Sequence, residues 1–304
     1  MNHRILDISE TPVRLKVRLD QLVIDPGSSQ QPVTIPLSDL AVLIVSHPQV
    51  SYTQAVLSGL ASAGGIFITC DERRLPNGML LPIQGNYIQS ERFSNQSAAS
   101  QPLRKRIWKQ VVRAKISAQA ELLEALFEND YGLRPLIPLV KSGDPQNIEA
   151  RAARKYWTII FGSNSFRRDR AALDQNRLLN YGYAVLRAIT ARAICASGLH
   201  PSIGIHHHNK YNPFCLADDL MEPFRVIVDH TVAQHVIEYG VDSEFDRDTR
   251  QHLLACLTGR LEFGGHSRTL FDSITRTAQS LNDVFAGEAR KLELPERMIC
   301  HATS

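Results

Sequence analysis

The chain has 304 residues, of which 43% are hydrophobic and 21% are charged, and its formal net charge is +3. This composition is typical of a globular protein of roughly two domains and excludes a disordered or collagen-like chain. Apolar runs such as residues 41–45 are far shorter than the ~18 residues that a membrane span needs. The five cysteines form no CxxC pair and no secretory signal is visible, so we expect a cytoplasmic protein without a disulfide framework.

The first 93 residues are predicted to form a small β-rich domain. Short segments rich in β-branched residues alternate here with Pro, Gly and Asn turn signals. The predicted strands are residues 4–8, 13–17, 22–24, 33–37, 41–45, 66–69 and 79–82. One helix is expected over residues 52–63, ended by Gly64 and Gly65.

A stretch rich in Ser, Gln and Asn marks the predicted domain boundary, and residues 94–304 are predicted to form a larger all-α domain. Apolar residues recur at helical spacing along one long helix, namely Ile107, Val111, Ala114, Ala118, Leu122 and Leu126. Another helix is expected to begin with Asp144 as its N-cap and Pro145 in its first turn. Two more are expected over residues 176–196 and 231–239, the latter being the last. The predicted fold class is therefore α+β.

Lysine and arginine are concentrated in two windows of the predicted helical domain. Residues 101–120 hold six of them and no acid, namely Arg104, Lys105, Arg106, Lys109, Arg113 and Lys115. Residues 151–170 hold six more against the single acid Asp169, namely Arg151, Arg154, Lys155, Arg167, Arg168 and Arg170. A basic helix face is often merely solvated, but two such windows favour a surface that binds a polyanion.

The segment of residues 204–225 has the residue types of a divalent-metal site. The middle one of three consecutive histidines, residues 206–208, precedes Glu222 by fifteen positions, and Asp219 lies three positions before Glu222. Residues at i and i+3 share a helix face, and carboxylates favour magnesium or manganese over zinc. Pro223 predicts a break in the helix at Glu222. Simpler interpretations are a polar loop for the histidines and a helix N-terminus for the acids.

Glu149 is the one acid within residues 147–157, and Arg151, Arg154 and Lys155 follow it closely. Taken alone, it is most simply interpreted as a surface glutamate that pairs with these bases, worth only a few tenths of a kcal/mol.

Four passages together give the chain a resemblance to a known family. They are EARAA at residues 149–153, NRLLNYGYA at 176–184, GIHHH at 204–208 and LADDLMEPFR at 216–225. The last passage is highly specific and the second is strong, and with the β-rich first third they cover essentially the whole chain. On these passages the chain resembles the CRISPR-associated integrase of spacer acquisition, the first-named Cas protein, in its type II form.

The resemblance implies a metal-dependent DNA endonuclease and integrase whose catalytic part is the helical domain. It implies that Glu149, His207 and Glu222 are catalytic and hold Mg2+ or Mn2+, with Asp219 as a supporting acid. The family's glycine-to-histidine spacing favours His207 as the ligand, and His206 is the alternative.

The resemblance further implies a homodimer that binds double-stranded DNA and inserts short foreign DNA, the prespacer, into a CRISPR array. Each 3′ hydroxyl would attack a phosphodiester of the repeat. Phosphate contacts are expected from the basic residues near Glu149, namely Arg151, Arg154, Lys155, Arg167 and Arg168. The implied protein partners are a small dimeric ferredoxin-like Cas protein, forming a heterohexamer, and the type II RNA-guided effector nuclease, with no membrane partner.

Two other function classes are compatible with the sequence. A non-catalytic nucleic-acid-binding scaffold would use the basic windows but gives the acids and the histidine no shared purpose. A zinc-dependent hydrolase of a small substrate would use the histidines, but the acid-rich ligand set argues against zinc.

Overall fold

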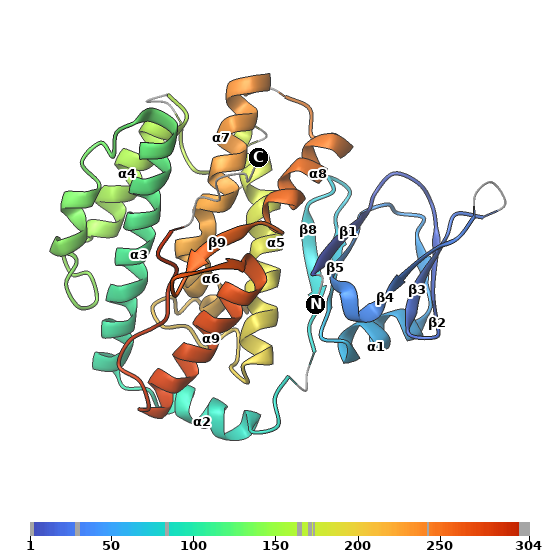
Figure 1. Cartoon of the computed structure of the whole chain (residues 1–304), viewed down its shortest axis with the longest axis horizontal. Helices are drawn as coiled ribbons and strands as arrows, with labels where there is room; N and C mark the ends of the chain where they lie inside the picture. The colour runs from blue at the N-terminus through green and yellow to red at the C-terminus, as the bar shows by residue number, and fades with distance from the viewer. Residues whose placement is uncertain are drawn as a thin grey trace.

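The computed structural model describes residues 3–27, 31–82, 85–162, 166–169, 172, 174–241 and 243–297. In this part of the chain a β-rich domain, with its N-terminal strands in blue, is followed by a larger helical domain (Figure 1). This arrangement confirms the predicted α+β fold. Arg170 and residues 298–304, which the sequence analysis assigned to the basic surface and to the helical domain, lie outside the described residues.

Among the described residues, two four-stranded sheets form the first domain. The first sheet has the order β1-β5-β7-β8, with β1 (Arg4–Ile8), β5 (Leu40–Val45), β7 (Ile66–Cys70) and β8 (Pro76–Leu80). The second has the order β4-β3-β2-β6, with β4 (Val33–Pro36), β3 (Gln21–Asp25), β2 (Arg14–Arg18) and β6 (Ser51–Tyr52). Strand β5 pairs in parallel with β1 and β7 and is buried almost throughout, as its continuous apolar run predicts.

Helix α1 (Gln54–Ser62) packs against β2 and β7 and so joins the two sheets. Its Val56 and Leu60 are fully buried in a core shared with Leu15 and Phe67. The helix ends before Gly64, whose φ of +73° is the left-handed conformation that favours glycine. The predicted helix is therefore confirmed, shorter by two residues at its start, where Tyr52 belongs to β6.

The second domain is built from helices, with one hairpin between α8 and α9. The helices are α2 (Gln89–Ala98), α3 (Gln101–Phe127), α4 (Ile148–Ile160), α5 (Gln175–Ala196), α6 (Cys215–Met221), α7 (Arg225–Tyr239), α8 (Arg247–Cys256) and α9 (Leu270–Ala286). Short 3-10 turns are η1 (Leu37–Asp39) in the first domain and η2 (Arg134–Leu139) and η3 (Glu222–Phe224) in the second. The hairpin consists of β9 (Arg260–Phe263) and β10 (His266–Thr269) and is an addition to the helical pattern expected from the sequence.

Helix α5 is the centre of the second domain and packs against α6, α7 and α9. Gly182 permits the close approach to α7, because a Cβ at this position would lie 2.4 Å from Cγ1 of Val228. This packing holds the segment from α6 to α7, which carries Glu222, against the middle of the molecule (Figure 1).

The expectation that the helix over residues 231–239 is the last one was wrong. Helix α7 ends at Tyr239 before Gly240, as the sequence indicates, but it is followed by α8 and α9 and is not the last helix. Helix α9 has ordinary start and stop signals: the Thr269 side chain accepts a hydrogen bond from the Asp272 N–H, and Gly287 has a φ of +81°.

Helix α2 runs across the boundary predicted between residues 93 and 94 and packs against α9. A division of the chain at that point stays a prediction. The two parts are tied together by Arg250 of α8, which is 1% exposed and pairs with Asp7 at 3.3 Å and with Glu10 at 2.6 Å. Among the helices that the structure describes, none is both long and apolar enough to cross a membrane.

Candidate metal centre

Glu149 lies in the first turn of α4, which begins three residues later than the sequence analysis expected. The N-cap is Asn147 and not Asp144, which lies three residues earlier in a turn ahead of the helix. Both residues have positive φ. The Asp144 carboxylate nevertheless accepts hydrogen bonds from the backbone N–H groups of Ile148 at 3.0 Å and Glu149 at 2.9 Å. It therefore caps the helix from outside and fixes the backbone that carries the Glu149 side chain.

Glu222 lies where α6 gives way to α7. The regular helix ends at Met221 and continues as the 3-10 turn η3, because Pro223 has no N–H to extend the helical ladder. This confirms the break predicted from Pro223. The turn packs against α3, and Glu222 is only 6% exposed.

Lys115 of α3 lies between the two glutamates. Its Nζ is 2.5 Å from Glu149 Oε1, and its side chain is 12% exposed. The same Nζ is 2.7 Å from Glu222 Oε2, outside hydrogen-bond geometry, so this second contact is an ion pair. Arg225 pairs with the other Glu222 oxygen at 3.0 Å. Two acids from different elements thus face one cationic group from a third.

The electrostatic surroundings keep these groups charged. Burial would raise the pKa of Glu222, but the neighbouring Arg225 and Lys115 outweigh it and lower this pKa to about 2. Burial would likewise lower the pKa of Lys115, and the carboxylates of Glu222 and Glu149 raise it instead. At neutral pH the site therefore holds an ionised Glu222 next to a cationic Lys115.

Asp219 organises the loop that carries the histidines. Its carboxylate is fully buried, and Oδ2 accepts hydrogen bonds from the N–H groups of Ile205 at 2.6 Å and His206 at 2.9 Å. Its Oδ1 lies 2.5 Å from Nδ1 of His207. Because a carboxylate only accepts, this contact places a hydrogen on Nδ1 and, in the neutral ring, leaves the lone pair on Nε2. The same hydrogen bond raises the pKa of His207 above its ordinary value.

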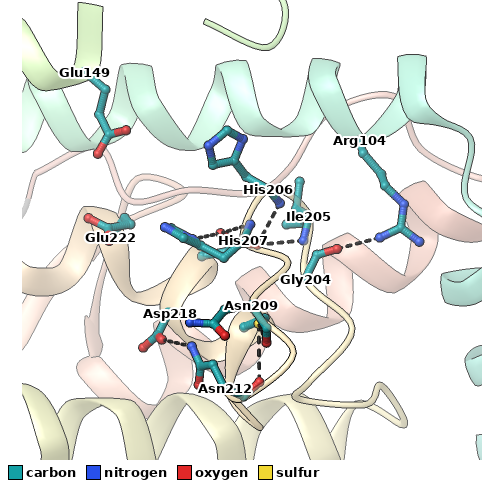
Figure 2. Close-up of polar contacts among 12 residues, drawn as sticks. Arg104, Glu149, Gly204, Ile205, His206, His207, Asn209, Asn212, Asp218 and Glu222 are labelled. Atoms are coloured by element: carbon teal, nitrogen blue, oxygen red, sulfur yellow. Dashed lines mark hydrogen bonds and ion pairs between the residues drawn. The ribbon is translucent and has the colours of Figure 1, made fainter. Parts of the chain in front are cut away.

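The ring of His206 does not point in the same direction as that of His207 but packs against α3 (Figure 2). It stacks on Trp108 of α3, with ring centroids 4.2 Å apart and planes within 3°. Burial lowers the pKa of His206. The stacking of the His206 ring on Trp108 and the orientation of the His207 ring by Asp219 support the choice of His207 over His206, and the ligand itself stays a prediction.

Gly204 and Arg104, which the sequence placed only in a basic window, fix the start of the same loop. Arg104 is 8% exposed and donates to the carbonyl oxygens of Gly204, Gln96 (2.9 Å) and Ala99 (3.1 Å). A Cβ on Gly204 would lie 2.3 Å from the carbonyl oxygen of His207. The loop can therefore close around Asp219 only with glycine at this position.

Figure 2 shows the Glu149, Glu222 and His207 side chains directed toward a common region. Within the described ranges, however, no group of three His, Cys, Asp or Glu side chains lies in position to hold a metal ion. The ammonium of Lys115 lies between two of the three predicted ligands instead. Two carboxylates and an imidazole nitrogen are a donor set that suits Mg2+ or Mn2+, and the contacts of Lys115 show that this site accommodates a cation.

The first basic window, residues 101–120, was expected to form a surface that binds a polyanion. This expectation was wrong for three of its six basic residues. Arg104, Arg113 and Lys115 all bind groups within the protein. Arg113 donates to the carbonyl oxygens of Pro138 and Val140, each at 3.2 Å. The other three basic residues of this window are exposed or half-buried.

The second basic window is more open. Exposed basic side chains lie along α4 and just after it, namely Arg151, Arg154, Lys155 and Arg167. Arg168 is half-buried and donates to Oδ1 of Asn176 at 2.8 Å and Oδ1 of Asn180 at 2.6 Å. Its contact with DNA stays a prediction, and these bonds show a role in holding the start of α5.

Comparisons with known proteins identify relatives of this chain. The sequence profile of the family described as CRISPR associated protein Cas1 matches residues 6–260. The CRISPR-associated endonuclease Cas1 of Neisseria meningitidis serogroup C (strain 8013) is 36% identical over 291 residues, or 93% of each chain. The CRISPR-associated endonuclease Cas1 2 of Pyrobaculum aerophilum is 27% identical over 88% of this chain and 94% of its own.

Solved structures share the fold. A casposase bound to integration product superposes with a TM-score of 0.79 at 22% identity, covering 95% of this chain and 92% of that chain. A CAS1 protein from Thermotoga maritima has a TM-score of 0.74 at 17% identity, and the match covers 94% of this chain and 98% of that chain. A Cas6-RT-Cas1–Cas2 complex has a TM-score of 0.73 at 17% identity, and the match covers 97% of this chain and 36% of that chain. The profile match and the 36% identical relative show that the chain belongs to the Cas1 family of CRISPR-associated proteins.

Proposed function

We propose that this chain is a metal-dependent DNA endonuclease and integrase that inserts prespacers into a CRISPR array. The observation that carries the proposal is the position of Glu149 and Glu222 on either side of one cationic group. The name of the Neisseria relative, an endonuclease, and the casposase bound to integration product support this class of reaction.

Glu149, His207 and Glu222 are the proposed ligands of Mg2+ or Mn2+. When bound, the metal would lower the pKa of the attacking hydroxyl, neutralise charge on the phosphate and align the displacement. Asp219 fixes the His207 ring through Nδ1 and so orients Nε2, and Asp144 fixes the first turn that presents Glu149.

No protein side chain has to attack the DNA in this reaction. The oxygen of the prespacer 3′ hydroxyl forms a new ester bond to the phosphorus of the repeat. The bond from that phosphorus to the neighbouring 3′ oxygen breaks, and the departing oxygen takes up a proton. One phosphodiester replaces another, so we expect no covalent protein–DNA intermediate and no need for an energy source.

Exposed basic residues beside Glu149 support binding of double-stranded DNA. Contacts from Arg151, Arg154, Lys155 and Arg167 to phosphates would position the duplex without reading its sequence. We further propose a homodimer that joins a small dimeric ferredoxin-like Cas protein in a heterohexamer and works alongside the type II RNA-guided effector nuclease. The Cas1–Cas2 complex among the structural neighbours supports a Cas protein as partner.

Substitution of the proposed ligands tests the function. Glu149→Gln, His207→Ala and Glu222→Gln should each abolish Mn2+-dependent joining of a prespacer 3′ end to repeat DNA. Duplex binding in EDTA, measured by gel shift, should be retained, and Glu91→Gln on the exposed face of α2 is the matched control. Joining that persists in EDTA would overturn the metal-dependent mechanism.

A non-catalytic nucleic-acid-binding scaffold is the second candidate. It accounts for the exposed basic residues, but it gives no reason to bury Glu222 near a second carboxylate at a substantial desolvation cost. A scaffold would bind duplex DNA equally with and without Mn2+ and would join none, so the same assay separates the two functions. A zinc-dependent hydrolase would show no affinity for the duplex at all.

A further inference from the structure

We infer that Lys115 is a built-in counter-cation, which holds the carboxylates of Glu149 and Glu222 together until a divalent metal displaces its ammonium group. The inference rests on the proposed function, because it takes the metal site of that proposal as given. It assigns to Lys115 a positioning role and control of metal affinity.

The contacts of Lys115 carry this inference. Its Nζ is 2.5 Å from an oxygen of Glu149 and 2.7 Å from an oxygen of Glu222, and the lysine comes from α3 while the acids come from α4 and η3. A divalent cation held by both acids would lie about 2.0–2.6 Å from the same oxygens. The ammonium and the metal therefore require the same oxygens and the same space, and their positive charges repel.

The metal-free protein needs a cation at this place. Glu222 is 6% exposed and the Glu149 side chain is 27% exposed, and two carboxylates brought together at a largely buried site repel unless a positive charge lies between them. Lys115 supplies that charge, so the two elements that carry the acids can pack in their final positions before metal binds. Lysine suits this role because its flexible four-carbon stem can withdraw, whereas the planar fork of arginine is held more rigidly.

Metal affinity tests the inference in the absence of DNA. We expect the Kd for Mn2+ of Lys115→Met, measured by calorimetry on the full chain, to be at least about tenfold lower than that of the wild type, because a competing charge is gone. Lys115→Arg, whose guanidinium withdraws less readily, should have a Kd at or above that of the wild type. Lys109→Met, on the same helix but without an ion pair among the described residues, is the matched control. A Kd for Lys115→Met equal to or above the wild-type value would overturn the inference, since the lysine would then support the metal ligands.

A second measurement needs no variant at Lys115. The wild-type protein is treated with an amine-acylating reagent in EDTA or in Mn2+, and the modified lysines are counted by mass spectrometry. Displacement by metal should increase acylation of Lys115 several-fold, while Lys109 should be modified equally in both conditions. Wild-type protein that binds Mn2+ without this increase would overturn the inference alone. Failure of every variant to bind Mn2+ would overturn the proposed metal site as well.

Discussion

Asp219 binds His207 at two places, because its Oδ1 lies 3.4 Å from the backbone nitrogen and 2.5 Å from ring Nδ1. The other oxygen of the same carboxylate accepts the N–H groups of Ile205 and His206. One buried acid therefore sets both the course of the loop and the direction of the ring. Since Asp219 lies three residues before Glu222, it also ties the histidine to the segment that supplies the second carboxylate.

The first prediction concerns this acid. Asp219→Asn keeps the size of the side chain but turns an NH2 group toward backbone N–H groups or toward Nδ1 of His207. We expect strand transfer to slow by about 10–100-fold and the free energy of unfolding to fall by about 1–3 kcal/mol. Joining rates in Mn2+ and urea unfolding measure the two effects. Asp248→Asn, at an exposed position of α8, is the control, and unchanged rates in Asp219→Asn would contradict the positioning role.

The second prediction separates His206 from His207. His207→Ala should abolish strand transfer, because it removes the nitrogen that faces Glu222. His206→Ala should retain most of the activity and lose about 0.5–1.5 kcal/mol of stability together with the stack on Trp108. His206→Phe, which can still stack, should recover that stability. Loss of activity in His206→Ala with full activity in His207→Ala would show that the neighbouring histidine is the ligand.

The spacing of apolar residues predicted that long helices exist better than it predicted where they begin and end. The apolar spacing from Ile107 to Leu126 identified α3 as one helix. The start of α4 was misplaced because Asp144 does cap the helix, but from a turn three residues ahead of the N-cap, Asn147. Helix α9 was missed although Thr269 and Gly287 mark its ends and apolar residues recur at helical spacing along it.

The sequence predicted the acids of the site but not the lysine that contacts them. The passages around Glu149 and Glu222 identified both acids, whereas the role of Lys115 depends on the packing of α3 against η3, a contact between distant parts of the chain. One signal was nevertheless present. Lys115 continues the apolar stripe through Val111 and Leu122 at helical spacing, and a lysine on such a stripe is seldom buried without a partner.

The third prediction distinguishes arginines that contact solvent from arginines that bind the protein. Arg151→Ala should make the slope of log affinity against log salt for duplex DNA less negative by about 0.9, the value for one phosphate contact. Arg113→Ala removes the same charge but from a guanidinium that donates to two carbonyl groups, so it should leave the slope unchanged. Filter binding between 50 and 200 mM salt, roughly the range over which such slopes are read, measures both. Equal changes in the two variants would mean that net charge alone governs binding.

The fourth prediction concerns Asp229 of α7, which is buried between Tyr156 and Tyr183 and accepts a hydrogen bond from each hydroxyl. Burial raises its pKa to about 6 from the ordinary value of 3.8, although the two tyrosines, Arg225 and Arg168 favour the ionised form. Between these two pH values the folded protein keeps a proton that the unfolded chain has lost. The stability gained in this way is complete below the lower value and disappears as the pH rises through the upper one.

Urea unfolding of the wild type and of Asp229→Asn across this pH range measures the effect. The asparagine cannot ionise, so the free energy of unfolding of the wild type should decline relative to the variant by up to about 3 kcal/mol as the pH rises from the lower to the upper pKa. Tyr156→Phe removes one donor that favours the ionised carboxylate, and it should move the midpoint of this decline to a higher pH. If the difference between wild type and Asp229→Asn is the same at every pH, Asp229 is already ionised in the folded protein, and the tyrosines and arginines then outweigh its burial.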